Sequence, residues 1–177
     1  MSPITMRGCA LLAWAALALP GGALAVEEGQ PVPQFAMASL SGDGNVSLTA
    51  HRGKVVYVDF WASWCAPCLK AVPALEKLRR EFPPGDFQVI AINLDRDLER
   101  ARKFLADHPV GYPSASDPAG KLPEMFGLET MPTSYLIDRS GVVRYVHRGY
   151  RAGDEVEIRK RIRELLGPER AVASPVR

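Results

Sequence analysis

Two continuous apolar runs, residues 54–61 and 87–93, are the strongest features of the sequence, and both are rich in β-branched and aromatic residues. Runs of this kind are typical of central strands covered on both faces. Over residues 67–82 the apolar positions recur every three or four residues, which predicts an amphipathic helix ended by two prolines and a glycine. Pro73 falls inside this helix, so we expect a kink near Leu69.

Weaker patterns complete a strand and helix order that predicts one α/β domain over residues 26–166. A hairpin is expected from alternation around a glycine-containing turn. In chain order the expected elements are hairpin strands at 34–40 and 45–48, a helix at 97–108, a short strand at 112–116, a short helix at 118–126, strands at 133–138 and 142–148, and a helix at 153–166. Alternating strands and helices require parallel pairing with right-handed crossovers, whereas the hairpin within 133–148 makes the sheet mixed.

Residues 1–25 differ from the rest of the chain, because they hold a single charged residue, Arg7, before an apolar stretch at 9–19. Pro20 and two glycines follow, and then the small-residue pattern Ala-Leu-Ala. This arrangement predicts a cleavable export signal. The apolar stretch is shorter than the roughly 20 residues that span a bilayer, so a retained membrane anchor is the weaker alternative. At the other end, residues 167–177 are expected to form a flexible tail.

Composition excludes several classes of protein. The 177 residues are 47% hydrophobic and 24% charged, with 22 basic against 20 acidic side chains, so neither a disordered chain nor a disulfide-dense miniprotein is indicated. Because basic and acidic residues are interspersed, no broad positive face is expected and nucleic acid is excluded as a partner. We expect a monomer.

Removal of the signal would leave two cysteines, Cys65 and Cys68, at the junction of strand 54–61 and helix 67–82. There the unpaired N–H groups and the dipole of a helix N-terminus favour a thiolate, which is the reactive form of cysteine. Pro67 suits a first helical turn. One helical turn separates the two residues, so their Cα atoms should lie about 5–6 Å apart, within the range for a disulfide.

These positions predict a division of labour, in which an exposed Cys65 attacks a substrate disulfide and a buried Cys68 resolves the mixed disulfide. The alternative is half of a zinc site. No second cysteine pair exists, and the three histidines lack ligand spacing, so we predict no metal and no cofactor other than the redox-active Cys65–Cys68 pair.

Segment 59–68, which reads Asp-Phe-Trp-Ala-Ser-Trp-Cys-Ala-Pro-Cys, resembles the active-site segment of thioredoxins. With the export signal and the preceding hairpin, the chain is similar to the TlpA/ResA-like branch of that superfamily from about residue 30 to 166. The resemblance implies a thioredoxin fold, a mixed central sheet flanked by helices with an N-terminal β-hairpin and an inserted βα unit. It also implies thiol–disulfide exchange outside the cytoplasm, by a protein that is periplasmic or otherwise exported.

Two further segments match the family. Residues 126–133 resemble the segment that carries a cis-proline beside the cysteines, which implies a cis bond before Pro132 and a Met131 backbone free to pair with an extended substrate. Gly149 resembles a glycine placed near the same groove. The expected substrate-contacting residues are Trp64, Ala66, Pro67, Met131 and Pro132. A plain packing role is the alternative for Trp64.

Asp59 interrupts an apolar strand six positions before Cys65. Burial of a carboxylate raises its pKa, so Asp59 is a candidate to take the proton of Cys68 through a water. The alternative is a strand-end carboxylate bonded to solvent or to a lysine. In one respect the chain departs from the family: many ResA-like proteins carry a glutamate three residues after the second cysteine, and here that position is Ala71.

The direction of electron flow is predicted from the uncharged pair Ala66-Pro67, which lacks a cation to stabilise the Cys65 thiolate strongly. We therefore expect a reductase of protein disulfides that is recharged by a membrane electron donor. A disulfide-forming oxidase or isomerase is the first alternative, and a Cu(I)-handling metal-site assembly protein is the second. An apocytochrome or a copper-site assembly factor is a candidate partner.

Overall fold

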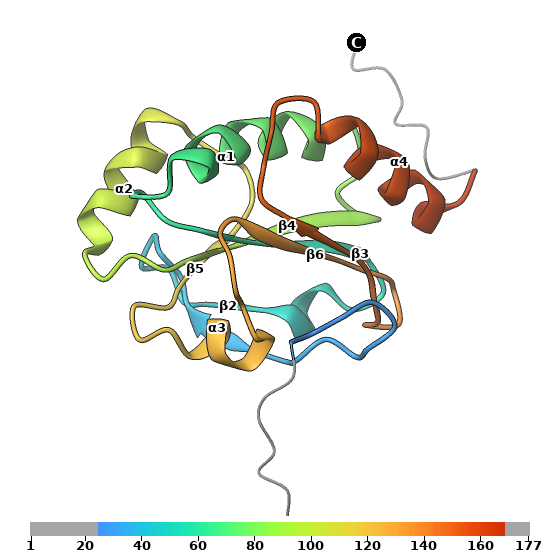
Figure 1. Cartoon of the computed structure of the whole chain (residues 1–177), viewed down its shortest axis with the longest axis horizontal. Helices are drawn as coiled ribbons and strands as arrows, with labels where there is room; N and C mark the ends of the chain where they lie inside the picture. Colours follow the sequence, from blue (N-terminus) through green and yellow to red (C-terminus); the bar gives the residue numbers. More distant parts are fainter. Residues whose placement is uncertain (1–24, 169–177) are drawn as a thin grey trace, which may run out of the picture.

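A five-stranded mixed sheet forms the centre of the molecule in the computed structural model, which describes residues 25–168 (Figure 1). The predicted export signal, apart from residue 25, and the tail from residue 169 lie outside the described residues. In sheet order the strands are β5(Ser114–Ser116), β4(Phe87–Asn93), β3(Val55–Trp61), β6(Thr133–Ile137) and β7(Val143–Arg148). The pairs β3–β4 and β4–β5 are parallel, and the pairs β3–β6 and β6–β7 are antiparallel. The sheet is thus mixed, as the sequence predicts.

Strand β3 occupies the middle of this sheet, and all seven of its residues are buried. The apolar run of β3 requires this position, because both faces of a central strand in an α/β sheet are covered. Asp59 is the one ionisable carboxyl group on the strand, and it is only 1% exposed. The carboxyl end of β3 leads directly into the segment that carries Cys65.

Two layers cover the sheet (Figure 1). One face is packed by α1(Ala66–Arg79), α2(Leu98–Asp107) and α4(Glu155–Leu166), and the other by the hairpin β1(Ala36–Ala38) and β2(Asn45–Ser47), the short 3₁₀ helix η1(Leu48–His51) and α3(Lys121–Phe126). Each face has its own apolar core. Among the residues that the structure describes, no helix is long and apolar enough to cross a membrane.

Several expected boundaries are wrong. The helix expected to end at residue 82 ends at Arg79, and the strands expected over 34–40 and 112–116 are shorter, at Ala36–Ala38 and Ser114–Ser116. Leu48, assigned to a strand, begins η1 instead. The helix expected from residue 118 starts at Lys121, because the Asp117 carboxylate accepts the N–H groups of Lys121 and Leu122 across a turn in which Gly120 has a φ of 69°. The helix expected from residue 153 starts at Glu155, after Gly153 with a φ of 103°.

Candidate active site

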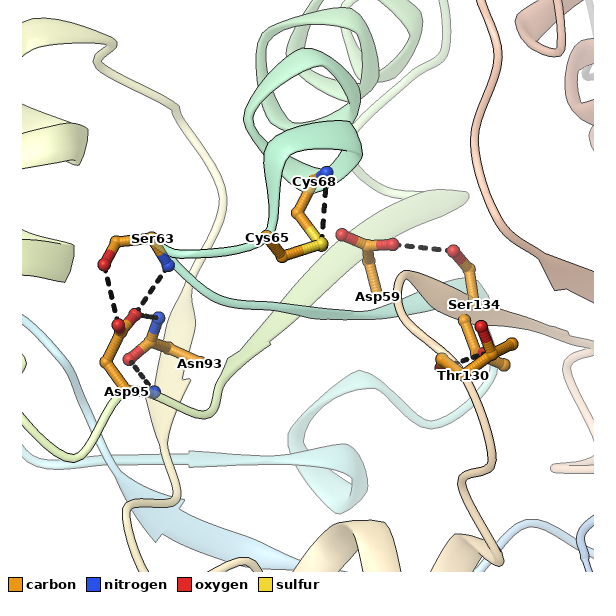
Figure 2. Close-up of a disulfide and its surroundings, with 9 residues drawn as sticks. Asp59, Ser63, Cys65, Cys68, Asn93, Asp95, Thr130 and Ser134 are labelled. Atoms are coloured by element: carbon orange, nitrogen blue, oxygen red, sulfur yellow. Dashed lines mark hydrogen bonds between the residues drawn. A yellow bond between two sulfur atoms is a disulfide. The ribbon is translucent and has the colours of Figure 1, made fainter.

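Cys65 and Cys68 form a disulfide at the N-terminus of α1 (Figure 2). Their Cα atoms are 5.2 Å apart, as one helical turn predicts. Cys65 is the N-cap residue, and its Sγ accepts a hydrogen bond of 3.3 Å from the backbone N–H of Cys68. This N–H is one of those that a helix leaves unpaired in its first turn, so it points at the atom that would carry the negative charge of a thiolate.

The expected exposure of Cys65 is wrong in this disulfide-bonded state. Cys65 is 6% exposed and Cys68 is fully buried. At the N-terminus of α1 both cysteines belong to the apolar core on the α1 face of the sheet. The residues on either side of Cys65, Trp64 and Ala66, are exposed, and Pro67 is too. Trp64, Ala66 and Pro67 therefore form an exposed rim around Cys65, whereas Cys68 is inaccessible to solvent.

Asp59 lies on β3 directly opposite Ser134 of β6, beside the cysteines. Its Oδ1 atom accepts a hydrogen bond of 2.6 Å from the Ser134 hydroxyl, and its Oδ2 atom is buried without a hydrogen-bond partner. Figure 2 shows this second oxygen on the side of the carboxyl group that faces the disulfide. The partner of Asp59 is thus a buried serine rather than solvent or a lysine.

Burial raises the pKa of Asp59 from its ordinary value of 3.8 to about 7, although the Ser134 hydroxyl acts in the opposite direction. The negative charge is disfavoured because the carboxylate has left water and has gained one neutral donor in return. A carboxyl group whose pKa lies near neutrality can both accept and release a proton at neutral pH, as proton transfer in catalysis requires.

The loop before β6 meets the cysteines because β6 pairs with the carboxyl end of β3, where Phe60 lies opposite Thr133. The Met131–Pro132 peptide bond is cis. The Pro132 carbonyl accepts the N–H of Gly149 at 2.7 Å, and the Thr133 hydroxyl donates to the Thr130 carbonyl at 2.8 Å. Met131 packs against the apolar core that contains both cysteines. The predicted site residues thus lie together at the edge of the sheet that contains the carboxyl end of β3.

Sequence reasoning missed three polar residues beside this edge, namely Asn93, Asp95 and Ser134. All three are buried, with exposed fractions of 0%, 2% and 3%. The first two could have been found, because polar residues at the carboxyl end of a strand adjacent to 54–61 are candidates for a site in an α/β sheet. Ser134 could not, since its role depends on the register of β6 against β3.

Ala71 is buried in α1, where many ResA-like proteins have a glutamate. The buried acid on this helix is Glu76, a further five residues along. Desolvation acts to raise the pKa of Glu76, but hydrogen bonds from Arg79, the Gly111 N–H and Arg80 hold it at about 2. Glu76 is therefore a permanently ionised anchor between α1 and the loop before β5, and it does not replace the missing glutamate.

Comparison with known proteins places the chain in a family. The sequence model of the redoxin family matches residues 27–162. This chain belongs to the redoxin family. It is 33% identical to the thioredoxin-like protein YneN of Bacillus subtilis over 135 residues, which are 75% of this chain and 78% of that protein.

Other members of this redoxin group have names that specify the chemistry. The chain is 29% identical to the thiol-disulfide oxidoreductase ResA of Bacillus thuringiensis over 132 residues, covering 75% of this chain and 76% of ResA. A structure titled as a putative thiol:disulfide interchange protein DsbE from Chlorobium tepidum is 40% identical, with a TM-score of 0.76 over 81% of this chain and all of the other. The predicted thioredoxin fold and ResA-like resemblance are confirmed, and this redoxin is a thiol–disulfide oxidoreductase.

Proposed function

We propose that this redoxin is exported and reduces disulfide bonds in proteins outside the cytoplasm through Cys65 and Cys68. The observation that carries the proposal is a cysteine pair at a helix N-terminus with the buried Asp59 carboxyl group beside it. The pattern of residues 1–25 supports export. In a compartment without cytoplasmic reductants, the disulfide seen here would be recharged by a membrane electron donor.

In the proposed cycle the Cys65 thiolate attacks one sulfur of a substrate disulfide, forms a mixed disulfide and releases the other substrate sulfur as a thiolate. The Cys68 thiol then loses its proton to the Asp59 carboxylate, by way of a water, and attacks the Cys65 sulfur. The second substrate thiolate leaves, and the Cys65–Cys68 disulfide forms. Two electrons have passed to the substrate, and the proton is held on Asp59 until it is released to solvent.

We assign substrate contact to the exposed rim and to the cis-proline loop. Trp64 is 64% exposed, which is high for a tryptophan, and it precedes Cys65 directly. Ala66 and Pro67, which follow Cys65, are exposed as well. On the opposite side, the backbone of Met131 before Pro132 would pair with an extended substrate segment, as in recognition by strand addition.

The reducing direction is supported by Ala66 and Pro67, which place no positive charge between the cysteines. A strongly stabilised thiolate makes a dithiol hard to oxidise and the protein a strong oxidant. Among the described residues, a thiolate on Cys65 would be stabilised by the N-terminus of α1 and by one hydrogen bond from a backbone N–H. We therefore expect the disulfide form to be favoured and the dithiol to donate electrons.

Equilibration of the full chain with glutathione tests this direction. We expect a reduction potential close to that of reducing thioredoxins, about −270 mV, and reduction of insulin by the dithiol form. A potential near that of strong oxidants such as DsbA, about −120 mV, would reverse the direction to disulfide formation. Stoichiometric Cu(I) binding without reduction of insulin would instead favour metal delivery.

A further inference from the structure

The loop that presents Cys65 is tied to the end of β4 by the side chain of Asp95 (Figure 2). The Asp95 carboxylate accepts two hydrogen bonds from Ser63, one from the backbone N–H to Oδ2 at 2.8 Å and one from the hydroxyl to Oδ1 at 2.7 Å. Asn93 donates a third, from Nδ2 to Oδ2 at 2.7 Å, and its Oδ1 accepts the backbone N–H of Asp95 at 3.2 Å. Both oxygens of the Asp95 side chain thus have hydrogen-bond partners, and Asp95 is only 2% exposed.

Ser63 stands two residues before Cys65, within the four-residue connection between β3 and α1. Backbone hydrogen bonds define the ends of this connection, since Leu94 N–H donates to the Trp61 carbonyl at 3.0 Å and Cys65 N–H donates to the Ala62 carbonyl at 3.1 Å. Between them, Asp95 holds Ser63 through both its main chain and its side chain. A two-point contact of this kind fixes the orientation of Ser63 as well as its distance from Asp95.

We propose that Asp95 is a positioning residue for thiol–disulfide exchange, which acts through Ser63 to hold Cys65 at the N-cap of α1 with its sulfur on the Cys68 N–H. Asp95 is not expected to touch substrate. The inference depends on exchange at Cys65 and is independent of the direction of electron flow, so it stands or falls separately from the proposed reductase function.

Two substitutions of Asp95 separate the effect of its hydrogen-bond geometry from the effect of its charge. In Asp95→Asn the amide oxygen can take the place of Oδ2 and accept from Ser63 N–H and Asn93 Nδ2. The amide nitrogen then takes the place of Oδ1 and donates to the Ser63 hydroxyl, which is able to accept. Asp95→Asn therefore keeps all three contacts without the charge, whereas Asp95→Ala removes them.

Asp138 offers a matched control at the opposite end of the sheet, just after β6. Its Oδ1 accepts the N–H and the hydroxyl of Ser140, at 2.9 and 2.6 Å, and the N–H of Val142 at 3.1 Å. Asp138→Ala removes the same kind of serine contact from a turn that has no part in the cysteine site, and it also removes the 2.6 Å ion pair between Asp138 Oδ2 and Arg144. Loss of stability alone would affect both alanine variants.

The experiment measures how fast the reduced full chain reacts with oxidised glutathione, together with the thermal midpoint of each variant. We expect Asp95→Ala to slow the attack of Cys65 about tenfold, because small displacements of a reacting group are costly. Asp95→Asn should react at close to the wild-type rate, and Asp138→Ala should lose stability with an unchanged rate.

Ser63→Ala, which keeps the backbone contact, provides a milder variant if Asp95→Ala does not fold, and it should react at an intermediate rate. A wild-type rate in Asp95→Ala or Ser63→Ala would overturn the proposal. Equal slowing in Asp95→Asn and Asp95→Ala would also overturn it, since the charge and not the geometry would then matter.

Discussion

Replacement of Asp59 by asparagine is expected to make the oxidised chain progressively more stable than wild type as pH rises. The difference in free energy of unfolding between variant and wild type should shift in favour of the variant by about 3 to 4 kcal/mol between about pH 4 and pH 8. The folded state holds the Asp59 proton up to about pH 7, whereas the unfolded chain loses it near the ordinary value of 3.8. Between these values the unfolded state binds fewer protons, so the stability of the wild type falls as pH rises. Asparagine has no such titration.

Urea denaturation at a series of pH values measures this difference. The unpartnered Asp59 oxygen would become an equally unpartnered amide in the variant, which adds a cost that does not depend on pH. The slope with pH is therefore the informative quantity. A stability difference between Asp59→Asn and wild type that stays constant from acid to neutral pH would show that the folded Asp59 titrates like an exposed carboxyl group.

Asp59→Asn also removes the proposed proton acceptor, so decay of the mixed disulfide should slow about a hundredfold near neutral pH while the chain stays folded. Ser134→Ala is the matched control, because it keeps the acid and removes the hydroxyl that lowers the pKa of Asp59. Its exchange rate should depend on pH as in wild type, with the midpoint displaced upward. An unchanged rate in Asp59→Asn would remove Asp59 from the mechanism.

Replacement of Cys68 by serine should abolish turnover of disulfide substrates and leave partners bound to Cys65 as stable mixed disulfides. The serine hydroxyl cannot displace the substrate sulfur, and no other cysteine of the described residues is available to do so. Mass spectrometry of complexes isolated from the exporting cell would identify the partners. Recovery of an apocytochrome, a copper-site assembly factor or a component of general disulfide formation would name the pathway.

Cys65→Ser is the control for this trap. Cys68 is fully buried behind the rim, so a chain that retains Cys68 but lacks Cys65 should capture almost nothing at this site. If Cys65→Ser captured partners as efficiently as Cys68→Ser, the division of labour between the two sulfurs would be wrong.

Much of the fold follows from local sequence patterns. Strand β4 has the predicted bounds and β3 differs by one residue, because continuous β-branched and aromatic runs have few alternative structures in a domain of this size. The start of α3 depended on the Asp117 side chain, which competes with a helical first turn in a way that apolar periodicity does not record. Helix boundaries that depend on such side-chain contacts can be predicted only when the three-dimensional partners of each polar group are known.

The candidate site likewise combines residues that the local sequence predicts with residues that it does not. Helix position and spacing were enough to place Cys65 and Cys68, and the position of Asp59 within an apolar run was enough to predict that Asp59 is buried. The cis bond before Pro132 came only from the family resemblance. Ser134 and Asp95 were missed because their roles arise from register and from contacts between loops. The exposure of Cys65 was overestimated because Cys65 packs into the apolar core together with Cys68.

Ionisation of Cys65 in the reduced Cys68→Ser chain tests the account most directly, and it can be followed by the ultraviolet absorbance of the thiolate. The helix N-terminus should stabilise the charged sulfur, so the thiolate should form well below about pH 8.5, where free cysteine ionises. Ionisation at or above that pH would contradict the account, because Cys65 would then lack the reactivity on which the exchange depends.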